Sequence, residues 1–135
     1  MRPSFHPKKV RLAQPDDIDR TALVAGSGFY YSPANEYERP FRDKYARDTY
    51  ESYRHELRKC MWDPKRILVV IDATFNQNED EKLYPALKAE FAGRAWPRKD
   101  GKVVVGFACL SLRQDSSRTG TFQPQGALLS TNRLG

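Results

Sequence analysis

The sequence is poor in cysteine and histidine. It has two cysteines, Cys60 and Cys109, and two histidines among 135 residues, with no Cys-x-x-Cys spacing. Structural zinc sites need several such ligands at characteristic spacings, and disulfide-dense folds need more cysteines, so both classes are excluded. Each cysteine lies among apolar residues, and we therefore expect two buried, unpaired thiols in a protein of a reducing compartment. No metal site is expected.

Long apolar runs are also missing. No stretch reaches the roughly 18–20 apolar residues that would span a bilayer, and the N-terminus lacks the apolar core of a secretory signal. We therefore expect no membrane partner and a cytoplasmic protein, with a nuclear location as the alternative.

The charged residues form no run of a single sign. Lysine and arginine total 23 against 17 acidic residues, which gives a net charge of +6 and a general preference for anions. The two signs alternate, as in residues 39–48, and in residues 45–58 the tyrosines follow the apolar helical stripe while the arginines do not. A small basic nucleic-acid-binding protein therefore ranks last among the functions considered.

Apolar periodicity predicts two helices and three strands. The first helix starts near Pro15 and ends near residue 28, and the second covers 48–62 with Asp48 at its first turn. Strands are expected at 9–13, 66–72 and 103–112. The run 66–72 has no polar face, so we expect an interior strand that is covered by helices on both sides.

The remaining segments divide the chain. Residues 1–8 form a lead-in and residues 9–113 a domain, within which 73–100 is a charged insertion that can hold a short helix at 79–91. Residues 114–135 are polar and lack a helical period, so we expect an irregular tail.

Three segments, Val10–Ile18, Asp63–Ile71 and Gly101–Ala108, carry a resemblance to a known superfamily. In this order the chain resembles the N-terminal half of the Gcn5-related N-acetyltransferase (GNAT) superfamily. It is similar in particular to fungal GNAT-domain proteins, which carry an aromatic loop after the first helix and a polar insertion before the third strand. The resemblance implies an α+β fold. That fold would be a partial GNAT-like unit with a mainly antiparallel three- to four-stranded sheet, packed by two N-terminal helices in the order β-α-α-β-insertion-β.

The resemblance also implies a reaction. GNAT enzymes transfer an acyl group from acetyl-CoA to an amine, so the partner would be a small-molecule or peptide amine. Their diphosphate-binding loop reads Q/R-x-x-G-x-G/A and opens a helix, where glycines admit the backbone and the helix dipole favours phosphate. The frames that begin at Gln123 and Gln125 both place Leu128 where glycine or alanine is needed. We therefore expect a chain that lacks this loop and is poorly active by itself.

A non-catalytic alternative stays open. The chain can be a truncated fragment or a protein-interaction module whose unfinished sheet exposes an edge strand. A second copy of the chain or a partner chain would then cover that edge.

Two groups of residues become site candidates through the resemblance. The first group lines the acceptor side in the family, and the second lies at the end of the third strand near the cofactor. The substrate-binding candidates are Phe29, Tyr30, Tyr31 and Asn35, and the cofactor-binding candidates are Cys109, Leu110, Ser111 and Arg113. The structural alternative is an aromatic loop that packs over the sheet. No residue is assigned a catalytic role, because Glu51 and His55 are four apart on a helix but are typical of a solvated pair.

Overall fold

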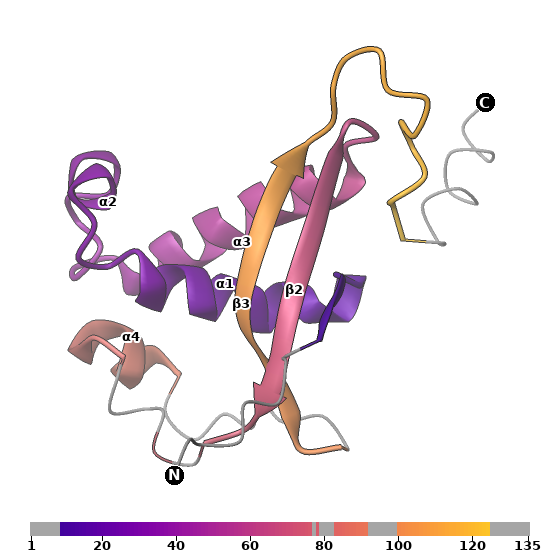
Figure 1. The fold of residues 1–135 in the computed structure, drawn as a ribbon. Coiled ribbons are helices and arrows are strands. Elements are labelled where there is room, and N and C mark those ends of the chain that lie inside the picture. Colours follow the sequence, from indigo (N-terminus) through magenta and orange to yellow (C-terminus); the bar gives the residue numbers. More distant parts are fainter. Residues whose placement is uncertain (1–8, 77, 79–82, 92–99, 125–135) are drawn as a thin grey trace, which may run out of the picture.

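The computed structural model describes residues 9–76, 78, 83–91 and 100–124 (Figure 1). The elements are β1 (Val10–Leu12), the 3-10 turn η1 (Pro15–Asp17), α1 (Ile18–Gly28), α2 (Pro33–Glu38), α3 (Ala46–Trp62), β2 (Arg66–Thr74), α4 (Pro85–Glu90) and β3 (Lys102–Ser111). This order and the antiparallel sheet confirm the expected α+β class and its partial GNAT-like arrangement.

The sheet has three antiparallel strands in the order β1-β2-β3. Val10 pairs with Ile71 of β2, and Ile67 pairs with Leu110 of β3. A bulge interrupts the β2–β3 register between Ile71 and Asp72. The interior position predicted for the 66–72 run is therefore confirmed.

Helices α1 and α3 cover one face of this sheet, behind the strands in Figure 1. The predicted apolar stripes form the core, because Ile18, Ala22 and Ala25 of α1 are buried. The buried residues of α3 include Tyr50, Tyr53, Leu57, Cys60 and Met61, as its apolar spacing predicted. From β2, Leu68 and Val70 complete this core.

The opposite face of the sheet has no helix within the described residues. The expectation that helices cover β2 on both sides is therefore not met within the described residues. The two longest described helices, α1 and α3, lie on the same face of the sheet. Helix α4 packs against α3 and not on the opposite face.

Arg11 joins three elements on the helix side of the sheet. Its Nη1 and Nη2 donate to the Asp17 carboxylate at 2.7 and 2.9 Å, and its Nε and Nη2 donate to Asp72 at 2.6 and 3.0 Å. These paired hydrogen bonds raise the pKa of Arg11 far above its usual value. The guanidinium therefore fixes β1 and the start of α1 to β2.

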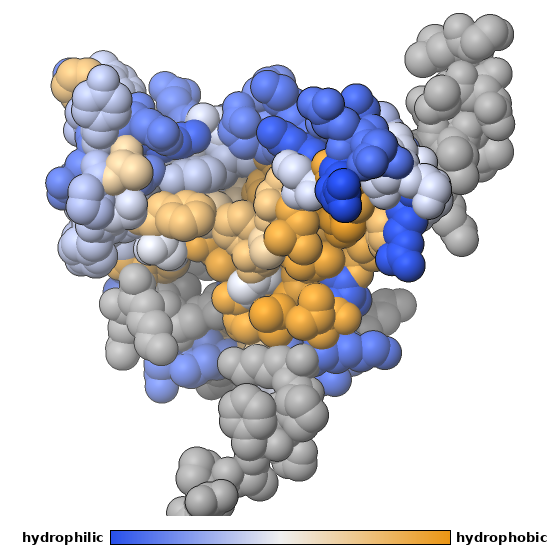
Figure 2. Space-filling model, turned by 45° about the horizontal axis from the view of Figure 1, so that its top comes forward, coloured by the Kyte–Doolittle hydropathy of each residue, from blue (hydrophilic) through white to orange (hydrophobic). Residues whose placement is uncertain are grey.

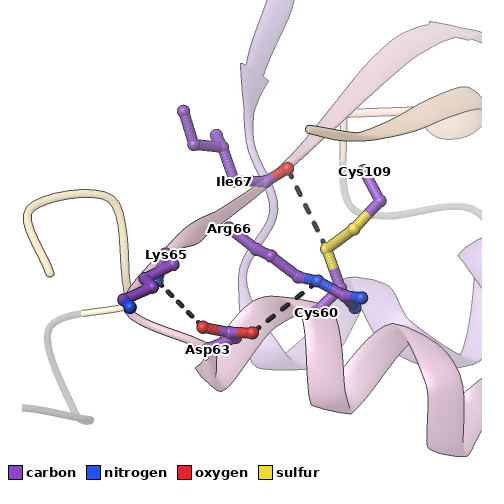
Figure 3. The surroundings of a disulfide bond; sticks show 6 residues. All are labelled: Cys60, Asp63, Lys65, Arg66, Ile67 and Cys109. Atoms are coloured by element: carbon purple, nitrogen blue, oxygen red, sulfur yellow. Dashed lines mark hydrogen bonds and ion pairs between the residues drawn. A yellow bond between two sulfur atoms is a disulfide. The ribbon is translucent and has the colours of Figure 1, made fainter. Parts of the chain in front are cut away.

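The two cysteines form a disulfide, which corrects the expectation of buried, unpaired thiols (Figure 3). Cys60 lies in the last turn of α3 and is buried, whereas Cys109 of β3 is exposed. The bond crosses from α3 to β3, and the Cys60 Sγ lies 3.9 Å from the carbonyl oxygen of Ile67 on β2. The inference of a reducing compartment loses its support, since it was based on free thiols.

Two further segments differ from expectation. The polar link after the aromatic loop contains α2, which starts at Pro33 because proline suits the first position of a helix. The chain after β3 is irregular over its described part, yet it returns to the start of β2. There, Gly120 N donates to Pro64 O at 2.7 Å, and Gln123 Nε2 donates to Trp62 O at 2.7 Å. None of the helices in the described residues is long and apolar enough to cross a membrane.

Candidate functional site

A groove of about 330 Å³ runs between α3 and the free-edge strand β3. Its lining comes from the end of α1, from α3, from the first residue of β2 and from the second half of β3. The lining residues are Phe29, Tyr53, Glu56, Leu57, Cys60, Arg66, Phe107, Cys109 and Ser111. The groove therefore joins Phe29, a substrate-side candidate, to Cys109 and Ser111 from the cofactor side.

Three aromatic rings form one end of the groove. Phe29 stacks on Tyr53 with ring centroids 6.2 Å apart, and it meets the edge of Phe107 at 6.0 Å. Phe29 caps the C-terminal end of α1 and remains 45% exposed, so its ring is available to a bound molecule. The arrangement can pack against the apolar part of a small acceptor.

Tyr53 is held in place by residues of α2 and of the segment that follows it. Its hydroxyl donates to Asn35 Oδ1 at 2.6 Å, and the guanidinium of Arg39 lies 4.2 Å from its ring centroid. Burial raises the pKa of Tyr53 above its ordinary value. Asn35 is itself buried, and it therefore positions the groove wall without lining the groove.

Tyr30 and Tyr31 lie away from the groove. The Tyr30 ring stacks on Tyr84 with centroids 4.2 Å apart, while its hydroxyl donates to Asp43 Oδ1 at 2.7 Å. This hydrogen bond raises the pKa of Tyr30. Arg42 lies over the same ring, with its guanidinium carbon 4.5 Å from the centroid. Tyr30 thus stabilises the segment between α1 and α3, and the side chain of Tyr31 is almost fully exposed.

The other end of the groove carries charge. Glu56 projects from the exposed side of α3 and has no ion pair with any described residue, whereas Arg66 lies 3.6 Å from the Asp63 carboxylate (Figure 3). Cys109, in its disulfide, and Ser111 form the β3 side of this end. A carboxylate at the end of the groove opposite the aromatic rings suits a cationic amine, because it attracts an ammonium and accepts hydrogen bonds from it.

Two of the cofactor candidates lie outside the groove. Leu110 alternates with Cys109 and Ser111 along β3, so its side chain points to the opposite face of the sheet, where it pairs with Ile67. Arg113 follows β3 in an exposed hollow, where it lies 3.5 Å from Asp115. The structure therefore brings together Phe29, Cys109 and Ser111, places Asn35 behind Tyr53 in the groove wall, and leaves the other candidates apart.

Several groove residues had no signal in the sequence. Glu56 belongs to the polar face of a helix and Arg66 opens a strand, so each looks like an ordinary solvated charge. Phe107 falls in an apolar run that predicts only a strand. A larger cavity of about 410 Å³ lies between α1 and β3, but none of the site candidates lines it. There, Arg20 Nε donates to Val104 O at 2.9 Å.

A comparison with known proteins finds a protein that is similar to this chain over most of its length. No protein-family model matches the chain, and no solved structure matches it. The chain is similar to a protein named "Acetyltransferase" from Stachybotrys chartarum (strain CBS 109288 / IBT 7711), with 31% identity over 113 residues. The aligned region is 84% of this chain and 39% of the relative, so the chain spans well under half of the relative's length. The likeness is therefore to one part of a protein that carries this name.

No metal-binding group is found among the described residues, where no three histidine, cysteine or carboxylate side chains gather. The two helices of more than eight residues also offer no phosphate site at their N-termini. Asp19 lies in the first turn of α1 and Asp48 in that of α3, and a carboxylate there already occupies the favourable end of the helix dipole. The first turns of these two helices are therefore unfavourable positions for a phosphate group.

Tyr84 provides a test of the packing around Tyr30, away from the groove. The side chain is 4% exposed, and its hydroxyl has no hydrogen-bond partner among the described residues. Burial raises the pKa of Tyr84 to about 12. Its contribution to stability is therefore complete below pH 10 and is lost as pH rises through 12, because the unfolded chain releases the proton first. Because pH 11 lies about one unit above the ordinary pKa of tyrosine, we expect Tyr84→Phe to remove about 1.4 kcal/mol of this alkaline loss, measured by urea unfolding at pH 8 and pH 11. A similar alkaline loss in wild type and Tyr84→Phe would contradict this assignment, and Tyr31→Phe serves as the exposed control.

Proposed function

We propose that this chain supplies the acceptor side of a GNAT-type acetyltransferase, which transfers an acetyl group from acetyl-CoA to an amine. One observation carries the proposal: a single groove unites Phe29 after α1 with Cys109 and Ser111 of β3. The similarity to the Stachybotrys acetyltransferase supports the same chemistry.

The groove residues have separate roles in this proposal. The rings of Phe29, Tyr53 and Phe107 would pack against the apolar part of the acceptor and exclude water. Glu56, which forms no ion pair with a described residue, would attract the cationic amine and hold it at the mouth of the groove. The attraction between a carboxylate and an ammonium is strongest where water is partly excluded. Positioning of this kind is one route by which enzymes lower the barrier to a two-substrate reaction.

Binding of the cofactor's diphosphate is not attributed to the described residues. Each of their two longer helices carries an acidic residue in its first turn. The two sequence matches to the diphosphate-binding loop, which begin at Gln123 and Gln125, reach into a segment outside the described range. The proposal therefore assigns the acceptor groove to this chain and the diphosphate site to polypeptide beyond it. It follows that the chain alone would be a poor catalyst.

A chimera tests the proposed function. The matched segment of the Stachybotrys acetyltransferase is replaced by the corresponding residues of this chain, and acetylation of a panel of amines is followed by mass spectrometry. We expect acetyl transfer that depends on acetyl-CoA, and we expect Phe29→Ala to lower kcat/KM at least roughly tenfold, about 1.4 kcal/mol of transition-state stabilisation. Glu56→Gln should raise KM for cationic amines more than for neutral ones.

Matched variants separate the groove from general damage. Phe41→Ala removes an aromatic ring that is exposed and lies outside the groove, and Glu90→Gln neutralises a surface carboxylate near the other end of α3. Both should leave kcat/KM within about twofold. A folded chimera without acetyl transfer, or equal losses in Phe29→Ala and Phe41→Ala, would reject the proposed function.

A further inference from the structure

The disulfide between Cys60 and Cys109 forms part of the groove lining. Its two halves come from different walls, since Cys60 belongs to the last turn of α3 and Cys109 to β3 (Figure 3). A disulfide exchanges with a free thiol when the thiolate can approach one of its sulfur atoms. The groove therefore places a bond of known reactivity beside a space of about 330 Å³.

The two cysteines differ in their access to solvent. Cys60 is 1% exposed and belongs to the buried core, whereas Cys109 is exposed. Strand β3 is an edge strand of the described sheet, and its next residue, Leu110, is 50% exposed on the opposite face. Figure 2 shows an apolar area on that face, bordered by hydrophilic residues and covered by no described helix. An incoming thiolate therefore reaches the sulfur of Cys109 and not that of Cys60.

Three charged side chains lie at this end of the groove. Glu56 precedes Cys60 by one helical turn and lies on the same face of α3. Arg66 opposes Ser111 in the strand register, and its Nε lies 3.6 Å from a carboxylate oxygen of Asp63. The charges of Arg66 and Asp63 offset one another, whereas Glu56 has no ion pair with a described residue. The local charge is therefore negative, and it attracts a cationic thiol and repels an anionic one.

We propose that Cys109 is a thiol-exchange site and that small thiols carrying an ammonium group are its preferred partners. The thiolate attacks the Cys109 sulfur and forms a new S–S bond with it. The bond to Cys60 breaks, its electron pair passes to the Cys60 sulfur, and this sulfur takes up a proton that balances the one lost by the incoming thiol. No further oxidant is needed, because the thiol is oxidised as Cys60 is reduced. The exchange goes beyond the proposed acetyl transfer and needs no acetyl-CoA.

The surroundings of Cys60 favour persistence of the mixed disulfide. Burial disfavours a thiolate, and the last turn of α3 is the negative end of its helix dipole. The carbonyl oxygen of Ile67, 3.9 Å from the Cys60 sulfur, can accept a hydrogen bond from the new S–H group. Cys60 therefore stays protonated at neutral pH and attacks the adduct on Cys109 slowly, so the adduct remains in the groove.

Three small thiols of different charge test the site on the oxidised chain. Cysteamine is cationic, 2-mercaptoethanol is neutral and 2-mercaptoethanesulfonate is anionic, and each is supplied at the same thiolate concentration and low salt. Acid-quenched samples are analysed by intact mass and peptide mapping. We expect one adduct per chain, at least about tenfold more often on Cys109 than on Cys60. Cysteamine should react at least about threefold faster than the sulfonate, and about 1 M salt should remove this preference because it screens exposed charges.

Matched variants separate the site from general reactivity. Glu56→Gln should remove most of the charge preference, whereas Glu90→Gln, which neutralises a carboxylate paired with Arg47, should retain it. With cystamine, the disulfide of cysteamine, Cys60→Ser should gain the same adduct at least about tenfold faster than Cys109→Ser. The single thiol is exposed in the first variant and buried in the second.

The contrary outcomes concern the site and its partner separately. Equal modification of the two cysteines would overturn the exchange site, and so would a folded chain that gains no adduct while the unfolded chain reacts. Equal rates for the three thiols at low salt would overturn the preference for an ammonium group.

Discussion

Replacing Cys60 by serine is expected to lower the free energy of unfolding by roughly 4 kcal/mol. The disulfide closes a loop of 49 residues, and cross-linking a loop of this length removes a corresponding amount of conformational entropy from the unfolded chain. The bond also joins the end of α3 to β3, so its loss removes the covalent link between two walls of the groove. Chemical denaturation of wild type and Cys60→Ser, at equal protein concentration, measures the difference.

Reduction provides the matched comparison. A reducing agent should shift the wild-type unfolding midpoint to that of Cys60→Ser, and Cys109→Ser should behave in the same way because either variant opens the same loop. The reducing agent should leave both variants unchanged. An unfolding midpoint that is the same for reduced and oxidised wild-type protein would show that the bond contributes nothing to stability.

Replacing Arg11 by alanine is expected to cost about 3–5 kcal/mol, the range for breaking a poorly solvated ion pair from one side. The side chains of Asp17 and Asp72 are only 4% and 12% exposed, and the variant leaves both carboxylates without the guanidinium that serves them. Since native domains are stable by only about 5–15 kcal/mol, this loss is a large fraction of the total, and the urea midpoint should fall markedly. Circular dichroism with urea titration measures the loss.

Arg113→Ala is the control for this prediction. Arg113 is 88% exposed and lies 3.5 Å from an equally solvated Asp115, and surface pairs of this kind contribute about 0–1 kcal/mol. Arg11→Lys should recover part of the stability, because lysine restores the charge without the paired hydrogen bonds. If Arg11→Ala and Arg113→Ala are equally stable, the Arg11 network does not hold β1 in place.

The sequence predicted elements where one periodicity dominates. The apolar spacing of Ile18, Ala22 and Ala25 identifies α1, and the β-branched run after Arg66 identifies the central strand. The short strand β1 was predicted as well, but its orientation could not be. Val10 and Leu12 face the side of the sheet opposite the helices. Arg11 faces the helix side, where it donates hydrogen bonds to the carboxylates of Asp17 and Asp72.

The candidate site was predicted only in part, since it depends on contacts between distant segments. The pairing of Cys60 with Cys109 requires the last turn of α3, which packs against β2, to come close to β3, and no local spacing signals that arrangement. Phe29 was recognised through the family resemblance, whereas Glu56 gained significance only from its place at the groove. The α2 helix was missed because its few polar residues give no apolar stripe.

Calorimetric titration of acetyl-CoA tests the proposal that the diphosphate site lies in polypeptide outside this chain. For the isolated chain we expect no binding tighter than about 1 mM, near −4 kcal/mol, whereas the chimera should bind in the micromolar range. Micromolar binding by the isolated chain would contradict the proposal, because it would place a complete cofactor site within these 135 residues.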